Sequence, residues 1–291
     1  MRRLIINADD FGLTPGVNRA IVEGHAHGVI TSASLMANGP AFEEAVQLAR
    51  SLPQLSVGCH VVLVDASPLL IHCTSKSNTR FGNTLGVLAY RAMTKRLDQR
   101  QLEAQATAQI RKLQSAGISV SHCDTHKHAH ILPAVLQALL RAAKNCGVRA
   151  LRNPFALLPL PSALLFARPG LWKRYMQVNW LRRFADQFRN AVKDASLFTP
   201  DGTLGIVVTG ALDQKLFQAI VENMPEGTWE FVCHPGYNDA DLRATRTRLR
   251  ESREKELRVL TSDEARQILL RQEVELVTFR DLARSSYHGQ T

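Results

Sequence analysis

Short runs rich in valine, isoleucine and leucine alternate along the chain with longer stretches whose apolar residues recur at helical spacing. The short runs predict strands at Leu4–Ala8, Thr31–Met36, Ser56–Leu63, Ser119–Asp124, Val148–Arg152, Gly205–Thr209, Glu230–Cys233 and Glu275–Thr278. The longer stretches predict helices at Gly16–His27, Ala41–Ser51, Asp98–Ala116, Pro133–Cys146, Leu181–Ala195, Asp213–Asn223 and Ser262–Arg271. This repetition predicts an α/β fold with seven or eight parallel strands, either open or closed into a barrel. Two stretches, Val64–Gly86 and Asn153–Gly170, follow neither pattern and are predicted to be long loops or insertions.

Polar residues capable of catalysis follow several predicted strands, at the point where each strand ends. The active site of a (β/α) barrel lies at the carboxyl ends of its strands, so polar groups from separate strands would meet there. This distribution favours a barrel enzyme. The residues concerned are Asp9, Asp10, His60, Asp124, His126, Arg152 and His234.

The segment Ser121–His130 holds four of the ten histidines and one carboxylate. Neutral imidazole is a common metal ligand, and packing alone seldom requires so many histidines together. The residues that would share one face of an extended backbone are Asp124, His126, His128 and His130. We therefore predict the rim of a metal site with His126 as a ligand, while His128 and His130 orient substrate or support a ligand from behind. A solvated histidine-rich loop is the alternative.

Each of the other candidates also has a purely structural interpretation. Asp9 and Asp10 are either a helix cap or turn pair, or one binds metal while the other stays free as a base. His60 is either a core residue of an apolar strand or a second imidazole ligand. His234 is either part of a proline–glycine turn or a general acid that protonates a leaving group. Arg152 either pairs with Asp9 or solvates a loop.

Composition limits the environment in which the chain works. The five cysteines are odd in number and widely spaced without a CxxC pair, which argues against a disulfide framework and predicts a reducing compartment. Three of them, Cys59, Cys123 and Cys233, are expected to face away from the site and pack in the core. The first apolar stretch is too short for a signal peptide, and no run of about 18 apolar residues predicts a membrane span. We therefore expect a cytoplasmic protein, and its net charge of +10 favours an anionic surface as a neighbour.

Four short motifs occur in order along the chain. They are Asn7-Ala8-Asp9-Asp10-Phe11-Gly12, Gly58-Cys59-His60, Asp124-Thr125-His126-Lys127-His128-Ala129-His130 and Cys233-His234-Pro235. Together they resemble the YdjC-like family of carbohydrate deacetylases, which includes chitooligosaccharide deacetylases, and within it the hopanoid-biosynthesis-associated (HpnK) branch. The resemblance covers roughly residues 1–154 and 229–282 and is poor through residues 159–205. It implies one distorted (β/α) TIM-like barrel domain over residues 1–291, with a variable insertion at about 155–205.

The same resemblance implies a reaction and a set of residue roles. The reaction is hydrolysis of an N-acetyl group from an amino sugar with one divalent metal ion, Zn²⁺ or Mg²⁺. The implied roles are metal ligands for Asp10, His60 and His126, a base for Asp9 and an acid for His234. Arg152, His128 and His130 are candidates for contacting the substrate. Lys127 departs from the His or Gln that relatives often carry, and we expect it to alter substrate contacts.

The segment Phe155–Ala195 combines bulky apolar residues with clustered cations, which is typical of a membrane-surface segment. An ordinary packed helix with a solvated basic face is the alternative. With the branch resemblance, this segment favours a lipid-linked substrate, N-acetylglucosaminyl hopanoid, and peripheral contact with the cytoplasmic membrane face. Soluble chitooligosaccharides are the alternative substrate.

Two other classes of function stay open, a different metal-dependent hydrolase such as a phosphoesterase and a non-catalytic basic protein that binds a membrane or nucleic acid. The arginines between Arg243 and Arg258 alternate with acidic residues, which predicts a solvated, ion-paired helix and no nucleic-acid partner. A homodimer is compatible with the sequence.

Overall fold

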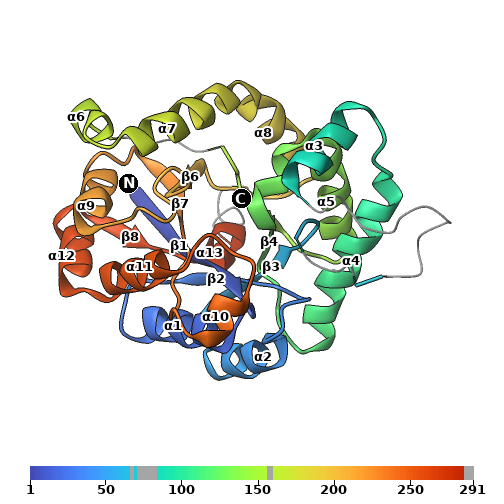
Figure 1. The fold of residues 1–291 in the computed structure, drawn as a ribbon. Coiled ribbons are helices and arrows are strands. Elements are labelled where there is room, and N and C mark those ends of the chain that lie inside the picture. Colours follow the sequence, from blue (N-terminus) through green and yellow to red (C-terminus); the bar gives the residue numbers. More distant parts are fainter. Residues whose placement is uncertain (66–68, 71–83, 156–159, 285–291) are drawn as a thin grey trace.

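Within residues 1–65, 69–70, 84–155 and 160–284, which the computed structural model describes, eight parallel strands form one curved sheet (Figure 1). The strands are β1 Arg2–Phe11, β2 Ser32–Leu35, β3 Ser56–Val61, β4 His122–Thr125, β5 Ala150–Leu151, β6 Gly202–Leu204, β7 Gly227–Cys233 and β8 Val274–Leu276. Their order across the sheet is β5, β4, β3, β2, β1, β7, β6, and β8 pairs with the first residues of β1. The parallel α/β fold expected from the sequence is confirmed.

The two edges of the sheet approach each other at β5 and β6. Ala150 of β5 forms a parallel bridge with Phe198, and the backbone N–H of Leu151 donates to the carbonyl of Phe198 at 2.9 Å. Farther along, the N–H of Thr203 donates to the carbonyl of Phe155 at 3.3 Å. The sheet therefore curves back on itself into a distorted half-barrel, in which no strand ladder joins β5 to β6 among the described residues.

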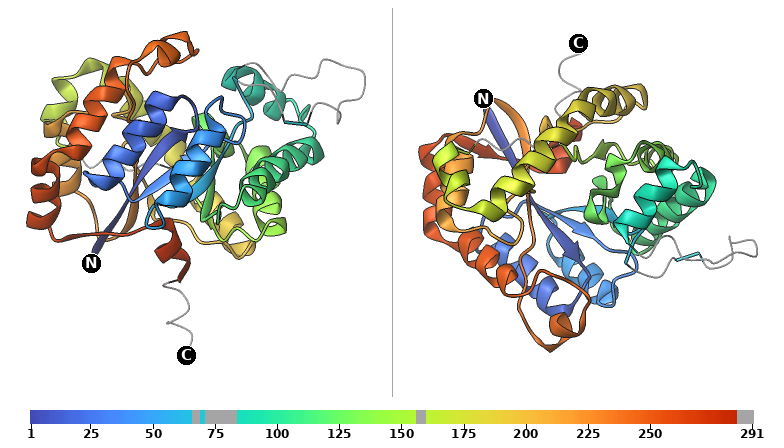
Figure 2. Two further views of the ribbon diagram at one scale, coloured as in Figure 1. Left: turned by 90° about the horizontal axis from the view of Figure 1, so that it is seen from below. Right: turned by 45° about the horizontal axis from the view of Figure 1, so that its top comes forward.

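Helices surround the outer face of this sheet (Figures 1 and 2). They are α1 Pro15–Ala26, α2 Phe42–Ser51, α3 Leu85–Met93, α4 Gln99–Ser115, α5 Pro133–Asn145, α6 Ser162–Phe166, α7 Pro169–Leu181, α8 Ala185–Asp194, α9 Gln214–Glu222, α10 Ala240–Ala244, α11 Glu251–Thr261, α12 Asp263–Arg271 and α13 Phe279–Arg284, with 3₁₀ turns η1 His126–Ile131 and η2 Arg182–Phe184. Side chains cap several of them: Thr14 accepts the N–H of Val17 at the start of α1, for example. In the part of the chain described here, no helix is long and apolar enough to cross a bilayer.

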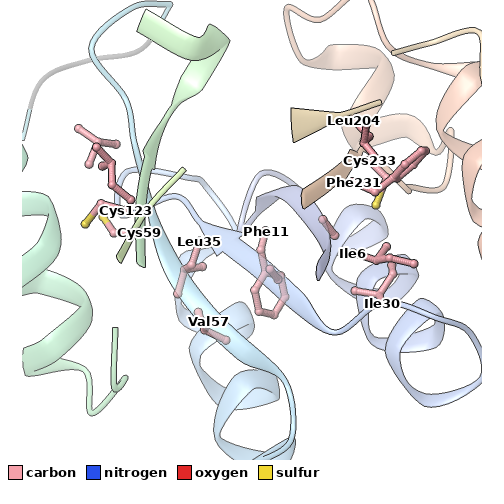
Figure 3. Close-up of a cluster of buried hydrophobic side chains, with 14 of the residues drawn as sticks. Ile6, Phe11, Ile30, Leu35, Val57, Cys59, Cys123, Leu204, Phe231 and Cys233 are labelled. Atoms are coloured by element: carbon pink, nitrogen blue, oxygen red, sulfur yellow. The ribbon is translucent and has the colours of Figure 1, made fainter. Parts of the chain in front are cut away.

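Apolar side chains fill the space between the sheet and the helices (Figure 3). Ile6 and Phe11 of β1 are completely buried in this core. Cys59, Cys123 and Cys233 lie in the same core and are also buried, so the prediction that these thiols pack away from solvent is confirmed.

Two predictions of local structure are wrong. The strand expected at Gly205–Thr209 lies instead at β6, which ends at Leu204, and a turn follows. Gly205 starts that turn with φ +91°, and a Cβ there would lie 2.4 Å from the carbonyl oxygen of Val232. The stretch Asn153–Gly170, expected to be irregular, contains helix α6, while residues 156–159 lie outside the described part. Most of the other expected loop, Val64–Gly86, also lies outside the described residues.

Candidate metal and catalytic site

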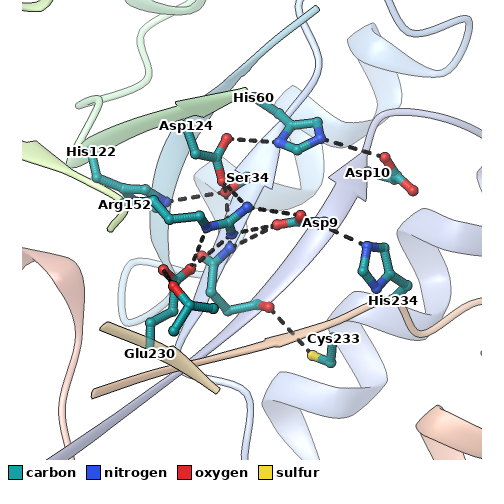
Figure 4. Close-up of polar contacts among 12 residues, drawn as sticks. Asp9, Asp10, Ser34, His60, His122, Asp124, Arg152, Glu230, Cys233 and His234 are labelled. Carbon is teal, nitrogen blue, oxygen red and sulfur yellow. Dashed lines mark hydrogen bonds and ion pairs between the residues drawn. The ribbon is translucent and has the colours of Figure 1, made fainter. Parts of the chain in front are cut away.

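Strand β1 carries a bulge at its two adjacent aspartates. Ala8 aligns with Ala33 of β2, but Phe11 aligns with Leu35, so β1 holds one extra residue over this interval. Asp10 adopts φ 67°, in the left-handed region that costs a non-glycine residue on the order of 1–3 kcal/mol. In a regular strand, neighbouring side chains point to opposite faces. Here Asp9 and Asp10 are both buried and both join one polar cluster at the end of the barrel (Figure 4).

Three side chains from separate strands converge beside this bulge: Asp10, His60 at the end of β3, and His126 directly after β4. The Nε2 atom of His60 lies 3.7 Å from Oδ1 of Asp10 and 3.3 Å from Nδ1 of His126. The third side of the triangle, from His126 Nδ1 to Asp10 Oδ1, is 3.4 Å. Ligands held about 2.1 Å from a tetrahedral ion are spaced about 3.4 Å apart, so this triangle matches three corners of such a site.

The chemistry of these donors also fits a cation. Oδ1 of Asp10 is buried without a hydrogen-bond partner, and it faces the two imidazoles. Burial opposes ionisation of Asp10, but Arg253 and the two histidines hold its pKa well below the ordinary range. Burial also opposes a charge on His60, yet the surrounding aspartates raise the pKa of His60 to about 9. The site therefore favours positive charge where the three donor atoms meet.

Asp124 on β4 fixes the orientation of His60. Its Oδ1 contacts Nδ1 of His60 at 2.7 Å, which leaves Nε2 directed at the cluster of donors. The hydroxyl of Ser34 donates to the other oxygen of Asp124 at 2.8 Å. A carboxylate behind an imidazole is the usual support for a metal-binding histidine, because it sets both the ring orientation and the tautomer.

Arg152, immediately after β5, is completely buried among carboxylates (Figure 4). It donates to both oxygens of Asp9, at 2.9 and 2.6 Å, and it also pairs with Asp124 at 2.8 Å and Glu230 at 2.8 Å. Of the two interpretations that the sequence allowed, the pairing of Arg152 with Asp9 is the one observed. Burial opposes ionisation of Asp9, but Arg152 outweighs it and lowers the pKa of Asp9 below its ordinary value.

His234 follows β7 and lies beside Asp9 on the other side of the cluster. Its Nε2 is 3.8 Å from Oδ2 of Asp9, its side chain is 12% exposed, and its Nδ1 has no hydrogen-bond partner. The backbone N–H of His234 donates to Glu256 of α11 at 2.6 Å. The same glutamate accepts the N–H of Gly210 at 3.0 Å, so it ties the loop after β6 to the turn that holds His234.

The sequence-based interpretation of α11 as a solvated, ion-paired helix is wrong for its inner face. Arg253 is 1% exposed and donates from Nη2 to Oδ2 of Asp10 at 2.5 Å, and Glu256 is buried as well. Both residues lie in a run of alternating charges, so their burial could not be recognised from charge alone. A usable signal was their spacing of three residues, together with Leu257 and Leu260, because that spacing marks one buried helix face.

The histidine-rich segment does not continue as an extended strand, so its histidines do not share one face. β4 ends at Thr125, and the 3₁₀ turn η1 follows with Lys127 and His128 at φ 56° and 52°. His130 is buried, and its ring contacts the Thr125 hydroxyl at 2.6 Å and the Arg152 carbonyl at 3.2 Å. His128 is half-buried, and Lys127 pairs with Asp65.

The amino-acid sequence is similar to those of known proteins over almost its whole length. A model of the YdjC-like protein family matches residues 3–271. The chain is 32% identical over 283 residues to a protein of Brevibacillus brevis named carbohydrate deacetylase, covering 96% of this chain and 99% of that one. It is 29% identical over 280 residues to a carbohydrate deacetylase of Clostridium beijerinckii, covering 96% and 100%.

A solved structure from Enterococcus faecalis, described as a candidate cellobiose-phosphate cleavage protein, superimposes with a TM-score of 0.74. The two chains are 24% identical, and the match covers 97% of this chain and 98% of the other. At this level of identity, the likeness shows that the two proteins share the fold.

Proposed function

The chain belongs to the YdjC-like protein family, and from this premise we propose that it is a carbohydrate deacetylase that uses one divalent metal ion. The observation that carries the proposal is the convergence of Asp10 Oδ1, His60 Nε2 and His126 Nδ1, with the ionised Asp9 alongside. Asp10, His60 and His126 would hold the metal. When bound, a divalent ion polarises an amide carbonyl and lowers the pKa of water. Two imidazoles and one carboxylate suit Zn²⁺ and also accept Mg²⁺.

Asp9 is the proposed base. Arg152 holds both carboxylate oxygens, so Asp9 is ionised and fixed in orientation before a substrate arrives. An Asp9 oxygen lies within 4.8 Å of a ring nitrogen of the proposed ligand His60, which supports the proposal that Asp9 is the base. Arg152 is enclosed by carboxylates, so in this scheme it acts on the reaction through Asp9 and does not touch the substrate.

His234 is the proposed acid. Its Nε2 is near enough to Asp9 to exchange a proton through a small adjustment or a single water, and its partly exposed ring can face a substrate. Expulsion of an amine from a tetrahedral intermediate requires a proton, which this imidazole would supply. His128, half-buried and two residues after the proposed ligand His126, is the remaining candidate for a substrate contact. His130 would support the Arg152 backbone through its contact with the Arg152 carbonyl.

For the substrate, we propose the acetamido group of N-acetylglucosaminyl hopanoid, at the cytoplasmic face of the membrane. Support comes from the sequence resemblance to the hopanoid-associated branch and from the apolar and basic residues of α6 and α7. Relatives named carbohydrate deacetylases are also compatible with soluble chitooligosaccharides.

The test measures acetate and phosphate released by the metal-loaded protein from three substrates. These are an N-acetylglucosaminyl glycolipid in mixed micelles, N,N′-diacetylchitobiose and a sugar phosphate. We expect acetate from the glycolipid, no phosphate, and loss of turnover on treatment with a chelator. Acetate released readily from chitobiose but not from the glycolipid would reject the hopanoid substrate, and phosphate release without acetate would reject deacetylation.

Two variants test the assigned roles. Asp9→Asn and His234→Ala should each keep bound metal, because neither side chain is a proposed ligand, and each should lower kcat by about 10²–10⁴-fold. Unchanged turnover in either variant would remove that residue from the mechanism.

A further inference from the structure

Helix α7 carries two apolar stripes, which meet where the rings of Trp172 and Tyr175 lie 5.9 Å apart. The inner stripe, which includes Leu171, Tyr175 and Val178, packs against the core. The outer one, which we call the α7 face, consists of Trp172, Met176 and Trp180 at a spacing of four residues, with Phe166 before it and Phe184 after it. These five side chains are between 39% and 67% exposed. A surface helix needs only one apolar stripe for packing, so the second stripe is not explained by the fold.

The aromatic rings of the α7 face are held together at both ends of the helix. Phe166 stacks on Trp172 with ring centroids 5.1 Å apart, and Trp180 meets Phe184 edge to face at 5.9 Å. The guanidinium of Arg183 lies 4.1 Å from the centre of the Trp180 ring. The rings therefore form a defined apolar ridge with cations beside it.

The charge along the segment that carries the ridge is mainly positive. Residues 161–185 include five basic side chains, Arg168, Lys173, Arg174, Arg182 and Arg183, and no aspartate or glutamate. Of these five, Arg168 pairs with Asp213 at 2.6 Å. A second copy of the chain packed symmetrically against this face would bring the same cations together, which is unfavourable. An anionic bilayer complements both features, because tryptophan prefers the membrane–water interface and each nearby lysine or arginine adds attraction to anionic headgroups.

The α7 face is linked to the proposed catalytic site through the loop after β6. Arg174 of α7 donates to the carbonyl of Thr209 at 2.6 Å, and the neighbouring Gly210 donates to Glu256 at 3.0 Å. Glu256 in turn accepts the backbone N–H of His234. A chain of hydrogen bonds through the loop after β6 therefore connects α7 to the turn that holds His234.

We propose that the α7 face binds the surface of an anionic lipid bilayer, with the helix lying in the headgroup region. Membrane binding itself does not depend on the proposed function. The consequence for catalysis rests on the proposed function. The protein would bind an amino sugar whose lipid part stays in the bilayer, and would deacetylate it without extracting the lipid into water.

The experiment is flotation of the full chain with vesicles of phosphatidylcholine, alone or containing phosphatidylglycerol. We expect binding to the phosphatidylglycerol vesicles, weakened by high salt. The double variant Trp172→Ala/Trp180→Ala should lower the vesicle partition coefficient at least about tenfold, and Lys173→Glu/Arg182→Glu should do the same through charge. The control for the tryptophan variant is Tyr90→Ala/Met93→Ala, which removes exposed apolar side chains from α3. The control for the charge variant is Arg271→Glu, which reverses an exposed cation on α12. Both controls should bind the vesicles as the wild type does.

Deacetylation of a soluble substrate separates this inference from the proposed function. Both α7 variants should retain it, since they leave the site intact, and retained turnover also shows that they fold. Equal binding of wild type and both α7 variants would overturn the proposal, as would wild type that floats with neither vesicle. A dimer abolished by the tryptophan variant would assign the face to a second copy, and an oligonucleotide that binds the face while vesicles do not would assign it to nucleic acid.

Discussion

Glu230 offers a quantitative test of the electrostatics around Arg152. This carboxyl is completely buried on β7, and it accepts a hydrogen bond from Nε of Arg152 at 2.9 Å. Arg152 also pairs with Asp9 and Asp124, so one cation faces three carboxylates. Burial therefore dominates for Glu230 and raises its pKa from 4.5 to about 7, despite the guanidinium beside it.

The perturbation is Glu230→Gln, which keeps the size and the hydrogen-bonding oxygen but removes the charge. Because the folded-state pKa of Glu230 lies above its unfolded value, its contribution to stability is fully present below about pH 4.5. That contribution is lost as the pH rises through about 7. The difference between the two pKa values corresponds to about 3 kcal/mol. Glutamine does not ionise, so the variant does not lose this stability as the pH rises.

The assay is urea unfolding at pH 4.5 and pH 8, with the free energy of unfolding compared between wild type and variant. From pH 4.5 to pH 8, the free energy of unfolding of the variant should rise by about 3 kcal/mol relative to that of the wild type. Glu222→Gln, at an exposed position on α9, is the matched control and should show no such change. A difference for Glu230→Gln that is the same at both pH values would refute the claim that this carboxyl is neutralised by burial.

Two further predictions concern the carboxylate that orients His60 and the packing of a glycine in the same strand. Asp124→Asn should weaken metal affinity about 10–100-fold in a metal titration, because it disturbs the carboxylate that orients His60; an unchanged affinity would show that this contact is dispensable. Gly58→Ala should destabilise the fold by about 1–3 kcal/mol in thermal unfolding, since a Cβ there would lie 2.3 Å from the buried ring of His122. Gly86→Ala, where the nearest atom is 3.9 Å away, is the control, and equal stability of the two variants would contradict the packing argument.

The sequence predicts which strands carry the candidate donors because parallel strands place their carboxyl ends at one end of a barrel. Asp10, His60 and His126 each follow or end such a strand, and the structure brings them together. The bulge at Asp9 and Asp10 could not be predicted, since it appears only in the pairing of β1 with β2. Without it, the two side chains would point to opposite faces of the sheet.

Other parts of the site depend on contacts that local sequence does not encode. The alternation of polar residues after Asp124 suggests a longer strand, but His128 adopts a left-handed conformation and the chain turns there. Arg253 and Glu256 look like surface residues within a charged run, yet the docking of α11 buries them against Asp10 and the His234 backbone. Burial of a charged side chain is decided by tertiary packing and by the partners that the packing supplies.

The central claim is that Asp10, His60 and His126 together hold one divalent ion. The most direct measurement is the metal content of purified protein by mass spectrometry, for the wild type and for His126→Ala. We predict one equivalent of metal per chain in the wild type, and loss of most of it in the variant while the protein stays folded. Full metal occupancy in folded His126→Ala would contradict the claim.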